Sequence, residues 1–177
     1  MSTVLILSLE RDPTILSHPS LVSGYVRNVL TALAVKRQSA TVVTLGERDE
    51  DVRLSDFTRV HRIQFAGTQD ELFTLLDARC SQADLIICVD AASSTVAQKV
   101  SGDRGLPLVS VVFDDELLAW DSTTLHWSDK LYVQSEHGMK LLIDAGVDPY
   151  TISLLAANPV GGMHAQDLLS ILEQEPA

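Results

Sequence analysis

The sequence is poor in cysteine, in aromatic residues and in basic residues. Its 177 residues include only Cys80 and Cys88, 5% aromatic residues, and 13 Lys plus Arg against 24 Asp plus Glu. The two cysteines have neither C-x-x-C spacing nor a His pair at metal-ligand distance in the sequence, which predicts buried free thiols. The net charge of −11 repels phosphate backbones and anionic lipids, and no Lys/Arg block interrupts it. We therefore expect no nucleic-acid partner.

Long apolar runs are also missing. The longest, such as residues 4–7 and 85–89, are far shorter than the roughly 20 residues that a membrane-spanning helix needs. The N-terminus lacks the basic flank of a signal peptide. We therefore expect no integral membrane segment and a cytoplasmic location. With 46% hydrophobic residues, the chain can bury the core of one ordinary domain.

The apolar residues that are present alternate between two patterns. Continuous runs predict buried strands over 4–8, 40–45, 84–89, 108–113, 131–133 and 151–155, with a more marginal strand over 59–65. Helical spacing predicts helices over 20–38, from 68, and over 91–100, 135–145 and 165–172. This order is typical of a doubly wound α/β fold with a mostly parallel sheet and helices on both faces. We expect one domain over 1–160, with a C-terminal helix in 161–177 packing on it.

Several cofactor and catalytic motifs are absent. The loop over 9–19, after the first strand, contains no glycine, which excludes the dinucleotide-binding G-x-G-x-x-G turn and the P-loop. No G-x-S-x-G elbow occurs, and the five histidines form no H-x-x-x-H pair. The sequence therefore predicts no cofactor and no metal site.

Polar residues follow several predicted strands, at the edge where ligands bind in such sheets. Asp90 and Asp114 are the candidate catalytic residues; Asp114 begins an acidic run, continued by Asp115 and Glu116, that could bind Mg²⁺ or act as a general base. The alternative is that this run complements the dipole of the next helix. Ser135 and Glu136 begin a predicted helix, whose free amides could bind an anion or a sugar hydroxyl. The alternative is that Ser135 is only the N-cap of that helix.

Three segments carry a resemblance to a known family: residues 24–46, 83–114 and, most closely, 128–155 with its D-x-hydrophobic, S-E, L-L and A-G-V pattern. They resemble the N-terminal, acceptor-side, Rossmann-like domain of GT-B glycosyltransferases, specifically the retaining family 4 group, and the resemblance covers residues 4–158. It implies that substrate-binding positions lie at Ser20, Ser23, Gly24, Ser135 and Glu136.

The chain also departs from the pattern of that family. The family carries a Gly-Gly pair at the start of the first helix, where this chain has Ser20 and Leu21. The family's second domain, which binds the nucleotide-sugar donor, has no counterpart in a sequence of this length. The resemblance therefore implies an acceptor-side domain that acts with a separate donor-binding chain or binds a glycan as a module. As an isolated chain it is not expected to be an active enzyme.

An alternative from a different class is a non-catalytic scaffold or regulatory domain. Apolar residues crowd into a segment with no regular pattern: Leu117, Leu118, Trp120, Leu125 and Trp127. They predict an interface for a protein partner or for a homo-oligomer, with Leu117, Leu118, Trp120 and Trp127 as its candidates. A small satellite core under a long loop is the other interpretation. A flavodoxin-like or receiver domain is less compatible, because the first strand and loop lack the residues those folds use.

Overall fold

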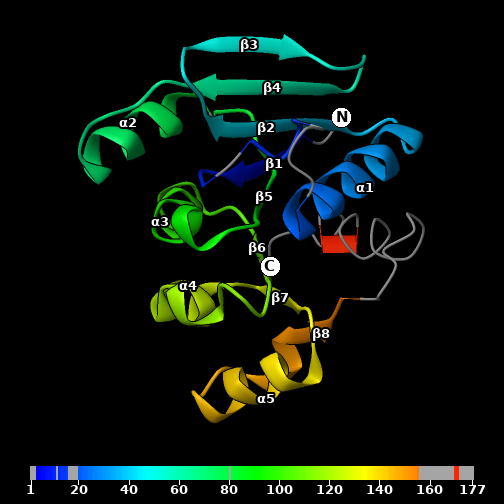
Figure 1. Ribbon diagram of the computed structural model, residues 1–177, viewed down its shortest axis with the longest axis vertical. Coiled ribbons are helices and arrows are strands. Elements are labelled where there is room, and N and C mark those ends of the chain that lie inside the picture. Colours follow the sequence, from blue (N-terminus) through cyan, green and yellow to red (C-terminus); the bar gives the residue numbers. More distant parts are fainter. Residues whose placement is uncertain (1–2, 11, 16–19, 80, 156–169, 172–177) are drawn as a thin grey trace.

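The computed structural model describes residues 3–10, 12–15, 20–79, 81–155 and 170–171. They form a sheet of eight strands in the order β3-β4-β2-β1-β5-β6-β7-β8, with helices on both sides (Figure 1). The strands are β1 Thr3–Ser8, β2 Ser39–Leu45, β3 Glu50–Arg53, β4 Thr58–Ile63, β5 Leu85–Cys88, β6 Leu108–Val112, β7 Lys130–Val133 and β8 Ile152–Leu154. The α-helices are α1 Leu21–Val35, α2 Gln69–Arg79, α3 Ser94–Arg104, α4 Ser122–Trp127 and α5 Glu136–Asp144, and 3₁₀ turns span Ala91–Ser93, Leu117–Ala119 and Pro149–Thr151.

The sheet confirms the predicted doubly wound α/β architecture. All strand pairs are parallel except β3 with β4. From β1 the chain builds outward through β2 to β4, then returns to the other side of β1 and continues from β5 to β8. The direction of winding therefore reverses between β1 and β5, and in open α/β sheets the crevice beyond the carboxyl ends of such a strand pair is where ligands bind.

The core lies in two layers, one on each face of the sheet. Helices α2, α3, α4 and α5 pack on one face and α1 on the other, as Figure 1 shows for α1 to α4. Every residue of β5 and of β6 is buried, because helices cover both faces there. Each fully buried aliphatic side chain, such as Leu33 of α1 or Ile87 of β5, contributes about 1.5–3 kcal/mol to folding.

The N-terminus of α1 is held by a reciprocal pair of serines. The Ser20 hydroxyl accepts a hydrogen bond from the Ser23 amide (3.1 Å), and the Ser20 amide donates to the Ser23 hydroxyl (2.8 Å). This capping box satisfies two amides that a helix leaves unpaired. It also fixes the direction in which the chain enters α1 beside the carboxyl edge of the sheet.

Two elements were not predicted. No strand was predicted over the acidic residues 47–51, yet β3 includes Glu50 and Asp51. Partners on β4 neutralise these two side chains: Arg62 Nη1 lies 2.8 Å from Glu50 Oε2, and His61 contacts Asp51. The segment that showed no regular pattern contains the six-residue helix α4, whose start Asp121 caps by accepting from the Thr124 amide (2.9 Å).

The predicted C-terminal helix falls mostly outside the described residues. Of its range only positions 170 and 171 are described, and Ile171 packs against the same core layer as α1. The division into 1–160 and 161–177 therefore stays a prediction. Among the described helices, none combines the length and the apolar character that crossing a bilayer requires.

Candidate functional site at the carboxyl edge of the sheet

A cavity of about 260 Å³ opens where the winding of the sheet reverses, beyond the carboxyl ends of β1 and β5. We call it the switch-point pocket. Its lining comes from the ends of β1, β5 and β6, the loop after β1 and the first turn of α1: Ser8, Glu10, Pro13, Ser20, Leu21, Val22, Asp90, Phe113, Asp115 and Glu116. The fold thus brings residues that are up to about a hundred positions apart in the chain into one concave surface.

Asp90 is the structural centre of this pocket. It is almost fully buried, and its carboxylate accepts hydrogen bonds from the Glu10 amide (3.0 Å), the Ser8 hydroxyl (3.1 Å), the Ser93 amide (2.9 Å) and the Ser93 hydroxyl. Burial raises the pKa of Asp90, although the hydrogen bonds from Ser93, Glu10 and Ser8 oppose that shift. A carboxylate has about four acceptor positions, so these bonds occupy it and tie the end of β1 to the start of the 3₁₀ turn. Asp90 therefore positions these segments of the chain, and a catalytic role for it stays a prediction.

Glu10 and Glu116 form a carboxyl pair at the pocket. Glu116 Oε2 accepts a hydrogen bond from the Ala91 amide (3.2 Å), and its side chain also hydrogen-bonds with Glu10. Burial and the contact with Glu10 raise the pKa of Glu116 to about 7, with a smaller contribution from the charge of Asp90. With a pKa near 7, the Glu116 carboxyl still carries its proton in a large fraction of the molecules at neutral pH. The pocket therefore offers both a carboxyl donor and carboxylate acceptors.

The remaining lining consists of hydroxyls and an apolar wall. Ser8 and Ser20 contribute hydroxyls, while Leu21, Val22 and Phe113 form an apolar surface. The Phe113 ring packs edge-on against Tyr25, with ring centroids 6.4 Å apart and planes at 74°, which holds it in place. Among the described residues that line the pocket there is no Lys, Arg or His. Its chemistry suits a neutral ligand rich in hydroxyl groups better than an anion.

The structure brings Ser20 and Asp90 of the predicted site residues into the pocket. Ser23 is buried behind Ser20 as the second half of the capping box. Gly24 follows in α1, and a Cβ built on it meets nothing within 4 Å. A close approach of the backbone at this position is therefore not visible in the described structure.

The other predicted residues lie at the neighbouring strand ends, outside the pocket lining. Asp114 follows β6, where its amide donates to Gln134 Oε1 (3.1 Å) and its carboxyl lies next to Gly138. Ser135 caps α5 by accepting from the Gly138 amide (3.1 Å), and Glu136 is exposed in the first turn of that helix. The N-cap alternative for Ser135 is thus observed, and a substrate role for Ser135, Glu136 or Asp114 stays a prediction.

Among the polar residues of the pocket, Ser8 and Glu10 were not candidates from the sequence, and Asp115 and Glu116 were named only as members of the acidic run that Asp114 begins. Ser8 and Glu10 flank the end of β1, and Glu116 lies three residues beyond Phe113, which follows β6. The signal that identifies them is topological, because the ends of β1 and β5 meet at the reversal point in any sheet of this order. Applying that rule to the predicted strands would have identified Glu10.

The four residues predicted as a partner interface divide into two pairs. Leu117 and Trp120 are buried in the core layer beside α3 and α4, as the satellite-core interpretation expects, so they do not face a partner. Leu118 is 97% exposed and Trp127 is 50% exposed, although the Trp127 indole donates to the Ser101 hydroxyl (3.1 Å). An interface through Leu118 and Trp127 stays a prediction.

The cysteine that the structure describes, Cys88, is not a reactive centre. Cys88 is buried at the end of β5, and burial and the charge of Asp90 raise the pKa of its thiol, so it is protonated at neutral pH. Cys80 lies outside the described residues. In the described part of the chain, no three His, Cys, Asp or Glu side chains are placed to hold a metal ion together.

No protein-family model matches this sequence, and a comparison with curated proteins finds no significant match. Solved structures do match. A sucrose-phosphate synthase structure from Thermosynechococcus elongatus superposes with a TM-score of 0.66 at 13% identity over 98% of both chains, and a second structure of it covers 87% of this chain and 47% of that one. UDP-GlcNAc 2-epimerase from Methanocaldococcus jannaschii superposes with a TM-score of 0.63 at 14% identity, over 99% of this chain and 50% of that one. Anabaena Alr3699/HepE, solved in complex with UDP-glucose, superposes with a TM-score of 0.60 at 14% identity, over 88% of this chain and 43% of that one.

The chain has the Rossmann-like fold of one half of a GT-B protein. It spans about half the length of the epimerase and of the Anabaena protein. At these identities the likeness shows the fold alone, so it confirms the GT-B part of the predicted resemblance. Membership of family 4 stays a prediction.

Proposed function

We propose that this chain is the acceptor-side half of a glycosyltransferase of family 4 type, and that it binds a neutral sugar or glycan in the switch-point pocket. The donor-binding half is supplied by a separate chain. The observation that carries this proposal is the lining of the pocket, which combines carboxyls, hydroxyls and an apolar wall with no cation among its described residues.

The charge of the pocket argues for an acceptor rather than a donor. A nucleotide sugar carries a diphosphate, which Asp90, Asp115, Glu10 and Glu116 would repel at short range. A sugar hydroxyl donates to a carboxylate in a charge-assisted hydrogen bond, and such bonds are the strong ones. The apolar wall with Phe113 offers a surface for the C–H face of a sugar ring.

Glu10 and Glu116 are the residues we assign to contact the acceptor. The carboxylate of Asp90 accepts hydrogen bonds from the chain itself, whereas Glu10 and Glu116, like Asp115 in the same lining, keep acceptor capacity for a ligand. The proton that Glu116 carries near neutral pH lets it donate to one sugar oxygen, while an oxygen of the Glu10 carboxyl accepts from another hydroxyl. Ser20, at the start of α1, adds a hydroxyl on the opposite wall.

The comparisons support a two-half arrangement. Several similar structures are about twice as long as this chain, and this chain covers 43–50% of them. The switch-point pocket lies at the edge of the sheet, where a second half would close over it. The cations that a departing diphosphate requires would then come from that second half.

A titration of the purified chain tests the proposal. Isothermal calorimetry with neutral oligosaccharides should show binding to at least one, whereas UDP-glucose should give no heat of binding. Glu10→Gln should weaken the oligosaccharide complex about tenfold, because it removes one charge-assisted hydrogen bond worth about 1.5–3 kcal/mol. Glu47→Gln, at an exposed position after β2, is the matched control and should change nothing. Binding of UDP-glucose in the absence of any oligosaccharide binding would refute an acceptor role.

The non-catalytic alternative has one observation in its favour. Leu118 is 97% exposed and Trp127 is half-exposed, so two large apolar side chains face solvent near α4. A scaffold domain would use them to bind a protein partner or a second copy. Mass measurement by light scattering after size exclusion separates the cases: a dimer that Leu118→Glu returns to monomer supports this alternative, and a monomer at high concentration contradicts self-association through this surface.

A further inference from the structure

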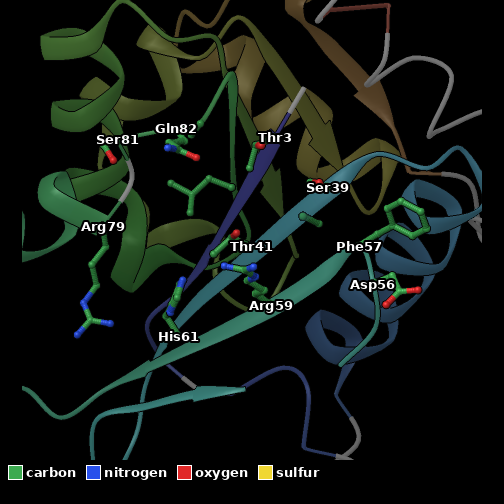
Figure 2. A pocket seen from close by; sticks show the side chains of 13 residues that line it. Thr3, Ser39, Thr41, Asp56, Phe57, Arg59, His61, Arg79, Ser81 and Gln82 are labelled. Atoms are coloured by element: carbon green, nitrogen blue, oxygen red, sulfur yellow. The ribbon is translucent and has the colours of Figure 1, made fainter. Parts of the chain in front are cut away.

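A second pocket lies at the opposite, amino edge of the sheet, and nothing in the proposed function uses it. It has a volume of about 370 Å³ and is lined mainly by residues from the first halves of β1, β2 and β4 and from the end of α2 with the loop that follows it. We call it the amino-edge pocket. Figure 2 shows its polar side chains, among them Arg59, His61, Arg79 and Thr41, coming from these separate elements.

The register of the strands explains why the floor of this pocket is polar. Leu5 of β1 pairs with Thr41 of β2, and Thr41 pairs with Arg59 of β4, so the three side chains form a row on one face of the sheet. Further along the strands the same face is covered by α2 and carries buried apolar residues such as Val43 and Ile63. Helix α2 ends at Arg79, and the pocket lies where that cover ends.

The amino-edge pocket gathers basic side chains, with Asp56 as the carboxylate among its lining residues, in a chain whose net charge is −11. Two guanidinium groups, those of Arg59 and Arg79, line it together with His61. Two carboxylates lie near them. Asp51 contacts His61 and lies 3.4 Å from Arg79 Nη1, and Asp56 is paired with Arg53 (2.6 Å).

Arg59 differs from the other cations of this region. In the described part of the chain it makes no ion pair, whereas Arg79 and Arg53 each have a carboxylate partner. Asp51 pairs with Arg79 and His61, and its charge also acts on Arg59. The Arg59 guanidinium makes no hydrogen bond to another described residue, so its five N–H donors can serve a ligand. Its neighbours Thr41, Ser39, Thr3, Ser81 and Gln82 add hydroxyl and amide groups around the same cavity.

We propose that the amino-edge pocket binds the phosphate group of a small phosphomonoester, or free phosphate, with Arg59 as its principal contact and Arg79 on the facing wall. A guanidinium fork fits two phosphate oxygens, and hydroxyls complete the coordination of the others. The volume of about 370 Å³ lies in the range of small-molecule pockets and accommodates more than a bare phosphate. The two pockets then divide the ligands by charge, with neutral hydroxyl-rich ligands at the carboxyl edge and phosphorylated ones at the amino edge.

A titration followed by ¹H–¹⁵N NMR tests this proposal with inorganic phosphate, glucose 6-phosphate and, as the uncharged comparison, glucose. Phosphate and glucose 6-phosphate should shift the amides of Thr41, Arg59, His61 and Gln82 in a saturable way, and glucose should leave these amides unchanged. Tighter binding of glucose 6-phosphate than of phosphate identifies a phosphomonoester as the ligand, and equal affinity identifies the phosphate group alone. Because this pocket shares no residue with the switch-point pocket, the result does not depend on the acceptor proposal.

Variants sharpen the test. Arg59→Gln should weaken phosphate binding at least tenfold. Lys140→Gln removes the same charge from an exposed position of α5 and should leave phosphate binding unchanged. Thr41→Val removes a hydroxyl without altering charge and should weaken binding several-fold. Equal weakening by Arg59→Gln and Lys140→Gln would show attraction by overall charge only and would overturn the proposal. The absence of saturable shifts at these amides would overturn it as well.

Discussion

Glu116 should make the stability of this domain fall as the pH rises. The pKa of its carboxyl is raised from 4.5 to about 7 by burial and by Glu10, so the folded chain holds a proton that the unfolded chain releases. A carboxyl whose pKa is raised by folding contributes stability that is complete below its unfolded pKa, near 4.5. That contribution is lost as the pH rises through the folded pKa, which places the change between about pH 4.5 and pH 7.

The size of the effect follows from the shift and from the exposure of the group. One pKa unit corresponds to about 1.36 kcal/mol, so the shift from 4.5 to about 7 sets an upper bound of about 3 kcal/mol. Glu116 is only half-buried, and solvent screening reduces the contribution to the order of 1 kcal/mol. Glu116→Gln removes the titrating group and should make the protein about 1 kcal/mol more stable than the wild type at pH 8, with a smaller gain at pH 5.

Urea unfolding at pH 5, 6, 7 and 8 measures this directly on the wild type, Glu116→Gln and Glu47→Gln. The difference in unfolding free energy between wild type and Glu116→Gln should grow with pH, whereas Glu47→Gln should follow the wild type at every pH. Glu10→Gln should also flatten the dependence, because it removes the neighbouring charge. If the curves of wild type and Glu116→Gln run parallel from pH 5 to pH 8, the carboxyl pair does not exist as described.

Three further changes test the packing around the site. Arg62→Gln should lower the unfolding free energy in urea by about 2 kcal/mol, since it breaks the pair with Asp12, whose side chain is 6% exposed. Arg53→Gln, in the largely exposed pair with Asp56, should cost under about 0.5 kcal/mol, and equal costs would contradict this. Gly24→Ala should raise the melting temperature, because α1 gains about 0.5–1 kcal/mol and the added methyl meets open space; a lower melting temperature would reveal a contact at this position. Trp120→Ala should cost about 3–5 kcal/mol in urea unfolding, while Leu118→Ala should be neutral, and the reverse order would place Trp120 outside the core.

The sequence predicts the parallel strands well because burial on both faces leaves an unmistakable pattern. The continuous apolar runs of β1, β5 and β6 appear at the predicted places, within one or two residues at each end. It predicts β3 poorly, because this edge strand is charged and owes its conformation to Arg62 and His61 on β4. Local patterns also missed α4, which is only six residues long and begins at the Asp121 cap.

The candidate site shows the same division. Asp90 was predicted because it follows a buried strand, and Ser20 because the family resemblance places a substrate-binding position at the start of the first helix. Glu10 carries no local signal, since glutamates in loops are common, and Glu116 stands out only as one member of an acidic run. Only the meeting of β1 with β5 places the two together. The amino-edge pocket depends on strand register and on where α2 ends, and neither appears in the pattern of single segments.

The sequence by itself determined the fold class, the acidic charge and the absence of the glycine-rich nucleotide turns, because composition and short-range periodicity are properties of single segments. The tertiary structure decided which carboxyl is held by the chain and which are free for a ligand. It also decided where the scarce arginines gather, because strand order and register bring together residues that are remote in the chain. A chain with few cations thus places two of them, Arg59 and Arg79, at one edge of its sheet and keeps them away from the pocket at the other.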